Sequence, residues 1–152
     1  TISVRNGRQC NCGLKGCLET YASATGVART AVELLQKEET SSLLREIPLE
    51  KITSKDVFDA AKKGDKHALE IFEFTANLLG EAFANFVAFS APEAIILFGG
   101  LARSREFIEK PIIESMNKNL VSIWKNKVKV DFSQLKDSDA AILGASALGW
   151  EL

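Results

Sequence analysis

The sequence Cys10-Asn-Cys12-Gly-Leu-Lys-Gly-Cys17-Leu-Glu19 contains all three cysteines of the 152-residue chain. An odd number of thiols cannot close into a complete set of internal disulfides, and Cys10 and Cys12 are too close together to pair easily. Zinc prefers four tetrahedral ligands and binds thiolates well, and the interleaved glycines permit tight turning. The spacing therefore predicts a metal site that uses Cys10, Cys12 and Cys17, with its fourth ligand supplied from elsewhere. Three unrelated buried thiols are the alternative.

Around this loop the composition is that of a soluble globular domain, with 46% hydrophobic and 26% charged residues. Nineteen Lys and Arg against twenty Asp and Glu argue against a nucleic-acid surface, since phosphate binding needs an excess of basic side chains. This charge balance does not exclude a small anionic ligand held by backbone N–H groups. No membrane-spanning run and no signal peptide are visible. Because the clustered thiols fit a reducing compartment, we expect a cytoplasmic protein without a membrane or nucleic-acid partner.

The hydrophobic pattern divides the chain into three segments. Residues 1–19 are expected to hold the end of a strand at 1–4 and the metal loop, and residues 20–90 a helical segment. Residues 91–152 are expected to form a βαβα unit. Apolar residues at helical spacing predict helices over 18–37, 54–64 and 66–90, separated by a polar connection at 38–51. Short apolar runs predict a buried parallel strand at 94–98 and a second strand at 128–132, with helices over 104–120 and 137–150.

This order of elements is α/β. Two core strands are too few for a free-standing doubly wound sheet, so further strands are expected upstream. The chain begins at Thr1 rather than at Met, which indicates a fragment of a longer protein.

Single residues carry further expectations. Ser54 and Asp65 are expected to cap helices, and Gly26 to break or bend one. A glycine within a helix lowers helix propensity, so Gly80 and Gly144 are expected where a neighbouring element packs closely. The only histidine, His67, is expected to be a solvated surface residue, because a lone histidine is rarely a metal ligand.

A second glycine pair follows the predicted strand, in Leu97-Phe98-Gly99-Gly100-Leu101. Ligands of open α/β sheets bind at the carboxyl ends of strands, and glycines let the backbone approach a flat ring or a phosphate. Taken alone, a plain strand-to-helix turn explains the pair equally well.

The motif Cys10-x-Cys12-Gly-x-x-Gly16-Cys17-Leu18-Glu19 resembles the zinc signature of the ROK family, which contains sugar kinases and sugar-responsive repressors. The sequence on either side is most similar to bacterial glucokinases of that family. The resemblance implies the C-terminal part of an actin-like ATPase (ribonuclease H-like) domain with a zinc-binding loop, lacking its upstream strands. It also implies a homodimer.

The resemblance gives roles to individual residues. Cys10, Cys12 and Cys17 would hold a structural zinc, with a histidine upstream of Thr1 as the fourth ligand. Glu19, which the residues alone make an ordinary first-turn acid, would accept hydrogen bonds from sugar hydroxyls. Gly99, Gly100 and Leu101 would line the ATP pocket.

The family's general base and its phosphate loop, which works with Mg²⁺, match nothing in this chain, so no catalytic residue is assigned. The fragment is expected to be inactive by itself. The parent is expected to transfer the γ-phosphate of ATP to the 6-hydroxyl of glucose or a related hexose. The sugar-effector domain of a ROK repressor and a zinc-stabilised interaction module are the alternatives.

Overall fold

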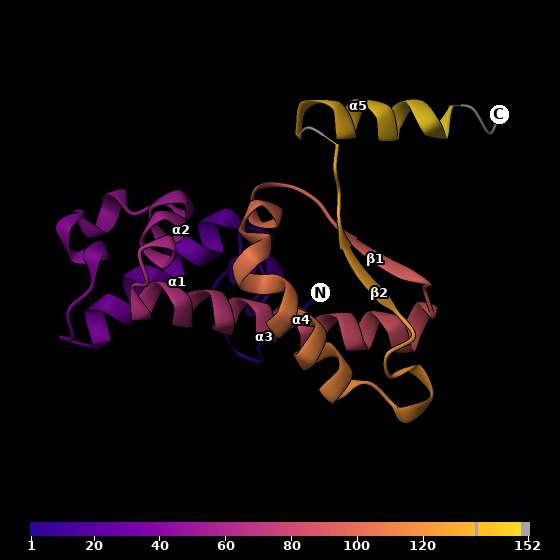
Figure 1. Cartoon of the computed structure of the whole chain (residues 1–152), viewed down its shortest axis with the longest axis horizontal. Helices are drawn as coiled ribbons and strands as arrows, with labels where there is room; N and C mark the ends of the chain where they lie inside the picture. The colour runs from indigo at the N-terminus through magenta and orange to yellow at the C-terminus, as the bar shows by residue number, and fades with distance from the viewer. Residues whose placement is uncertain (136, 150–152) are drawn as a thin grey trace.

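The computed structural model of the chain describes residues 1–135 and 137–149. A long helix, α3 (Lys66–Ser90), runs through the middle of the molecule (Figure 1). Helices α1 (Ala24–Lys37) and α2 (Ser54–Lys62) lie toward one end of it, and α4 (Arg105–Asn119) packs across it. The strands β1 (Ala94–Leu97) and β2 (Lys129–Phe132) lie toward its other end, and α5 (Asp137–Leu148) stands apart. Short 3-10 turns join these elements: η1 (Leu18–Thr20), η2 (Leu43–Glu46), η3 (Leu49–Lys51), η4 (Gly100–Ser104) and η5 (Ser122–Trp124).

Helix α3 forms the centre of the core because it is covered on more than one face. Ile71, Phe72 and Val87 are almost fully buried, and they belong to one cluster with apolar residues of α1, α2 and α4. Each such side chain contributes roughly 1.5–3 kcal/mol when it is removed from water. The predicted cap is confirmed, since the Asp65 carboxylate accepts from the Ala68 N–H at 3.0 Å.

At Gly80 the backbone of α3 lies close against α4. A Cβ atom at Gly80 would lie 2.5 Å from the Cβ of Ser115 and 2.7 Å from the carbonyl oxygen of Ile112. The Ser115 hydroxyl donates to the Asn77 carbonyl at 2.8 Å across the same contact. The close-packing expectation for this glycine is therefore confirmed.

The first residue of one helix and the cap of another differ from the prediction. Helix α1 begins at Ala24 instead of 18, because η1 forms a separate 3-10 turn and the Ser23 hydroxyl accepts from the Gly26 N–H. Gly26 thus lies in the first turn of α1 and does not break it. Helix α2 is capped by Thr53 in place of Ser54, because Thr53 and Asp56 form a reciprocal capping box.

The two strands pair in parallel, with Ala94 opposite Lys129 and Leu97 opposite Phe132. The predicted burial of the first strand is wrong for one of its faces. Ile95 and Leu97 pack against the core, whereas Ile96 is 67% exposed. The predicted strand end at 1–4 is reduced to a single antiparallel bridge between Ile2 and Cys17.

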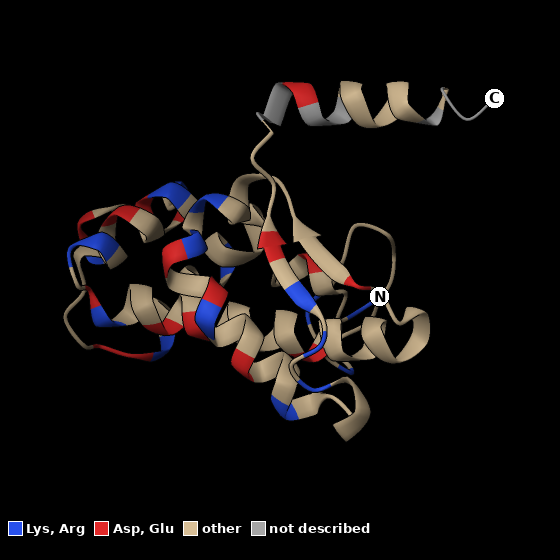
Figure 2. Ribbon diagram, turned by 45° about the vertical axis from the view of Figure 1, so that its right-hand side comes forward, with Lys and Arg blue, Asp and Glu red and all other residues tan. Residues whose placement is uncertain are grey.

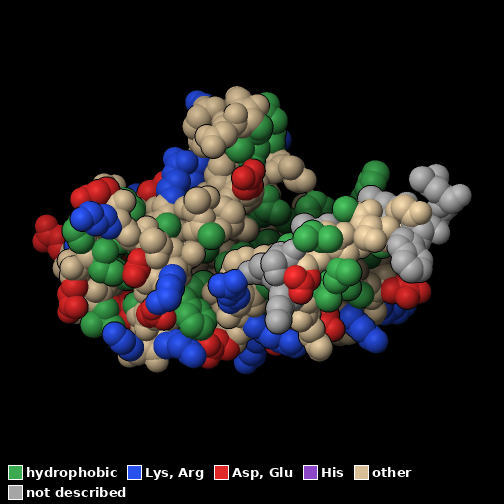
Figure 3. Space-filling view, turned by 90° about the horizontal axis from the view of Figure 1, so that it is seen from above, with side chains coloured by type: hydrophobic (Ala, Val, Ile, Leu, Met, Phe, Trp, Pro, Cys, Tyr) green, Lys and Arg blue, Asp and Glu red, His purple; other side chains and the backbone are tan. Residues whose placement is uncertain are grey.

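The remaining surface is mixed in character. Lys and Arg are interspersed with Asp and Glu on the helices at the α1 and α2 end of the molecule (Figure 2). In Figure 3 charged side chains of both signs gather at one side and along the lower edge, and hydrophobic side chains lie between them. Helix α4 continues through Pro111. Helix α5 ends at Leu148, and the predicted end at Trp150 lies outside the described residues. In the described ranges no helix combines the length and the apolar character needed to span a membrane.

Candidate functional site

The cysteine loop folds back on itself at Gly16. This residue has a φ of +80°, and a Cβ there would lie 1.7 Å from the carbonyl oxygen of Val4, so only glycine fits. The Gly16 carbonyl accepts from the N–H groups of Ser3 and Val4 at 2.8 and 3.1 Å. Its N–H donates to the Arg8 carbonyl at 2.8 Å. The turn therefore brings the two ends of the loop together.

This turn gathers the three predicted metal ligands. The Sγ atoms of Cys10, Cys12 and Cys17 all lie within 4.8 Å of one another, and those of Cys12 and Cys17 are 3.5 Å apart. A tetrahedral zinc with Zn–S bonds of about 2.3 Å separates its sulfurs by about 3.8 Å, so the donor set fits zinc. In the described part of the chain no further His, Cys, Asp or Glu joins the cluster.

The thiols influence one another strongly. The Leu14 N–H, followed by the neighbouring thiols, lowers the pKa of Cys12. The hydrogen bond with Cys12, together with burial, raises the pKa of Cys17 to about 11. One thiolate is therefore favoured while a second beside it is opposed. A divalent cation would remove that opposition, because thiolates are the form that binds metal.

Arg8 lies two residues before Cys10 and was not predicted to be a functional residue. It is 8% exposed, and its guanidinium donates to Glu33 at 2.7 Å. Partial burial acts to raise the pKa of Glu33, but hydrogen bonds from Arg8 and Arg29 outweigh it and hold that pKa below its usual value. No sequence pattern could find Arg8, because its partners lie 12 to 25 positions away.

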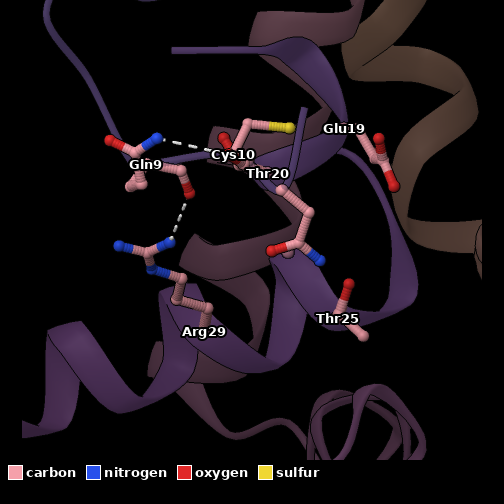
Figure 4. Close-up of a pocket in the computed structure, with 8 residues that line it drawn as sticks. Gln9, Cys10, Glu19, Thr20, Thr25 and Arg29 are labelled. Atoms are coloured by element: carbon pink, nitrogen blue, oxygen red, sulfur yellow. Dashed lines mark hydrogen bonds between the residues drawn. The ribbon is translucent and has the colours of Figure 1, made fainter. Parts of the chain in front are cut away.

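Glu19 lies beside the loop, in the first turn of η1, where its side chain is exposed. It lines a hollow of about 170 Å³ together with Cys10 and the following residues: Gln9, Asn11, Thr20, Thr25, Gly26 and Arg29. Figure 4 shows Glu19 and Arg29 on opposite sides of this hollow. The Arg29 guanidinium donates to the Gln9 carbonyl at 3.4 Å. The structure thus brings the predicted sugar contact and one predicted metal ligand to a single hollow lined mainly by polar side chains.

The residues after β1 border a second hollow of about 280 Å³. Gly100 and Leu101 line it, whereas Gly99 precedes it with a φ of +97° that turns the chain into η4. Phe58 and Phe72 supply apolar walls. At the rim, Lys55 and Asp59 form an ion pair at 2.7 Å. The hollow therefore combines apolar walls with a charged rim.

The expectation for His67 is wrong, because its side chain is only 7% exposed. Since a carboxylate only accepts, Nδ1–H donates to Glu70 at 3.2 Å, and Nε2 shares a hydrogen bond with the Thr40 hydroxyl. Glu38 completes a group of possible metal ligands with His67 and Glu70. Both ring nitrogens already have partners, so the histidine holds the connection after α1 against α3.

The sequence matches the model of one protein family. The model described as ROK family matches residues 1–151. The chain is 37% identical over 145 residues to the glucokinase of Thermotoga maritima, covering 94% of this chain and 45% of that protein. It is 29% identical over 142 residues to the DNA-binding transcriptional dual regulator NagC of Escherichia coli, covering 93% of this chain and 34% of NagC.

Among solved structures, a ROK family glucokinase from Streptomyces griseus in complex with glucose and AMPPNP superimposes with a TM-score of 0.82 at 29% identity. The match covers 97% of this chain and 49% of that one. The chain therefore spans less than half the length of these relatives.

Proposed function

The chain belongs to the ROK family, and from this premise we propose that it is part of an ATP-dependent glucokinase that phosphorylates the 6-hydroxyl of glucose. The observation that carries the proposal is the placement of Glu19 in a polar hollow next to the cysteine loop. Likeness to two proteins described as glucokinases supports the kinase activity.

In this proposal Glu19 accepts hydrogen bonds from hexose hydroxyls. A carboxylate is acceptor-only and makes charge-assisted bonds, which are stronger than those between neutral groups. Thr20 and Thr25 line the same hollow. The Thr20 hydroxyl donates to the Cys17 carbonyl at 2.7 Å, so its oxygen would only accept from the sugar, whereas the Thr25 hydroxyl would offer a donor or an acceptor. The result would be an oriented hexose.

Cys10, Cys12 and Cys17 would hold a structural zinc, which cross-links the loop when it is bound. Because Cys17 is both a metal ligand and the residue before η1, fixing its sulfur fixes the turn that carries Glu19. The loop thereby orients the sugar contact without taking part in the chemistry.

Gly100 and Leu101 would form part of the nucleotide pocket, with Gly99 shaping the turn that leads to it. The apolar walls from Phe58 and Phe72 suit a purine ring. We assign no residue of this chain to the general base or to the binding of the ATP phosphates and Mg²⁺, and we expect residues 1–152 alone to be inactive. The whole protein is proposed to be a cytoplasmic homodimer.

A second candidate function is the sugar-effector domain of a transcriptional repressor, which the likeness to NagC favours. Coupled ADP release from the whole protein with glucose and ATP separates the two. We expect turnover that requires both substrates. Binding of glucose without turnover would contradict the kinase proposal and favour the repressor.

A further inference from the structure

Arg8 lies two residues before Cys10 in a position where a cation is rarely found. Its side chain is 7% exposed, and a charge in such surroundings needs paired and hydrogen-bonded partners. The partners come from two different elements, η1 and α1. The contacts to η1 hold the turn that carries Glu19, and the contacts to α1 tie that turn to the helix.

The first set holds the turn that carries Glu19. Arg8 Nη1 donates to the Thr20 carbonyl at 2.7 Å, and the Arg8 backbone N–H donates to the Tyr21 hydroxyl at 2.9 Å. The guanidinium carbon also lies 4.3 Å from the centre of the Tyr21 ring. Because Thr20 follows Glu19 directly, these contacts fix the backbone on the C-terminal side of Glu19.

The second set ties the same guanidinium to α1. Arg8 Nη1 donates to the Gly26 carbonyl at 3.3 Å, and Nη2 donates to the Thr30 hydroxyl at 2.9 Å. Glu33 accepts from Nη2 and Nε at 2.7 and 3.1 Å. All five N–H donors of the guanidinium are thus used, which the three-donor ammonium of lysine cannot reproduce.

The far wall of the hollow joins this network through Glu33. Its second carboxylate oxygen accepts from Arg29 at 3.0 Å, and Arg29 reaches the Gln9 carbonyl. Gln9 and Arg29 line the hollow opposite Glu19. The ion pair between buried Arg8 and half-buried Glu33 therefore connects both walls.

We propose that Arg8 is a positioning residue for hexose binding. It holds the backbone beside Glu19 independently of the metal, which would hold the same turn through Cys17. Cys17 anchors the chain two residues before Glu19, and Arg8 anchors it one residue after. This proposal rests on the proposed function, in which Glu19 contacts the sugar.

The test is Arg8→Lys in the whole protein, which keeps the charge and loses the five-donor fork. We expect the KM for glucose to rise about tenfold, since a small misplacement of a contact has large effects. The KM for ATP and kcat should change less than about twofold, and zinc content should stay at the wild-type value. Arg105→Lys is the matched control, because Arg105 forms an exposed ion pair with Glu109, and it should leave both KM values unchanged.

Glu33→Gln provides a second, isosteric variant should Arg8→Lys fail to fold. It should show the same selective rise in the KM for glucose. An unchanged KM for glucose in a folded variant, an equal rise in both KM values, or loss of zinc would each overturn the proposal.

Hydrogen exchange separates this proposal from the proposed function. In zinc-loaded Arg8→Lys, amides of residues 18–26 should exchange faster than in the wild type, and unchanged exchange would overturn the role of Arg8. Absence of glucose turnover in the wild type would instead overturn the kinase proposal and leave the exchange result to decide the role of Arg8.

Discussion

Glu19 is an exposed carboxylate whose position depends on its neighbours in the chain. The cysteine loop ends at Cys17, and the Thr20 carbonyl accepts from Arg8 Nη1 at 2.7 Å. These contacts hold the backbone on both sides of Glu19. The exposed side chain is accessible to a ligand.

Replacement of Glu19 by alanine removes the proposed sugar acceptor. Hydrogen bonds to charged groups contribute about 1.5–3 kcal/mol, so the KM for glucose in the whole protein should rise about 10- to 100-fold. The KM for ATP should change less than about twofold. Steady-state kinetics with each substrate varied would measure both values.

Glu73→Ala is a suitable control because Glu73 is an exposed acid on α3, outside the hollow that Glu19 lines. It should leave both KM values unchanged. Loss of glucose and ATP binding to the same degree in Glu19→Ala would mean a misfolded protein and would remove Glu19 from the site.

The sequence pattern predicted the role of a residue only where its partners are close to it in the sequence. The cysteines could be predicted as a cluster because they are close in sequence as well as in space. Arg8 and His67 could not, because the burial of a lone charged or polar side chain depends on partners from distant positions. The family resemblance, and not the pattern, gave Glu19 its predicted role.

At the scale of elements, the crossing of α3 and α4 is set by Gly80. Gly80→Ala would place a methyl group 2.7 Å from the backbone oxygen of Ile112, which can move only if the two helices separate. We expect a loss of about 1–3 kcal/mol in the free energy of unfolding. Urea denaturation would measure it.

The close-packing expectation is wrong for Gly144, where a Cβ would meet nothing within 4 Å. Gly144→Ala in α5 is therefore the matched control. Since alanine is the better helix former, this variant should be neutral or up to about 1 kcal/mol more stable. Similar stabilities for the two variants would contradict close packing at Gly80.

The start of α3 depends on Asp65, whose carboxylate also accepts from the Leu43 N–H at 2.6 Å. Partial burial acts to raise the pKa of Asp65, but hydrogen bonds from Ala68 and Leu43 prevail and lower it. A depressed pKa contributes stability above the unfolded value of about 4, and this is lost as pH falls. Asp65→Asn should therefore be less stable than the wild type at pH 7.

The stability difference between wild type and Asp65→Asn should narrow as the pH falls from about 5 to 2, because the wild-type carboxyl becomes protonated. Denaturant titrations at several pH values would follow it. A difference that stays constant over this range would show that the charge of Asp65 contributes nothing to the cap.

Helices with a strong apolar periodicity could be predicted from the sequence. The first residues of the helices and the burial of the strands could be predicted less well. The apolar stripe of α3 and the cap at Asp65 are local signals, and both are confirmed. The start of α1 at Ala24 and the exposed face of β1 were missed, since they depend on a side-chain cap and on what packs against the strand.

At the scale of the whole molecule, the proposed zinc site and the helical core would stabilise different parts of the chain. The core cluster contains no cysteine among the described residues. Removal of zinc by a chelator should therefore lower the affinity of the whole protein for glucose at least about tenfold while most of the helical circular dichroism signal persists.

Metal analysis before and after chelation would accompany the glucose titration, and readdition of zinc should restore binding. About one zinc per chain is expected from the three-cysteine cluster. Protein that is free of metal as purified, with unchanged glucose affinity, would contradict a structural role for the loop.

The most direct test of the central claim is a crystal structure of the whole protein with glucose, with data collected at the zinc absorption edge. We predict an anomalous peak bonded to the sulfurs of Cys10, Cys12 and Cys17, and a Glu19 oxygen within hydrogen-bond distance of a glucose hydroxyl. Free thiols, or glucose bound away from Glu19, would contradict the account.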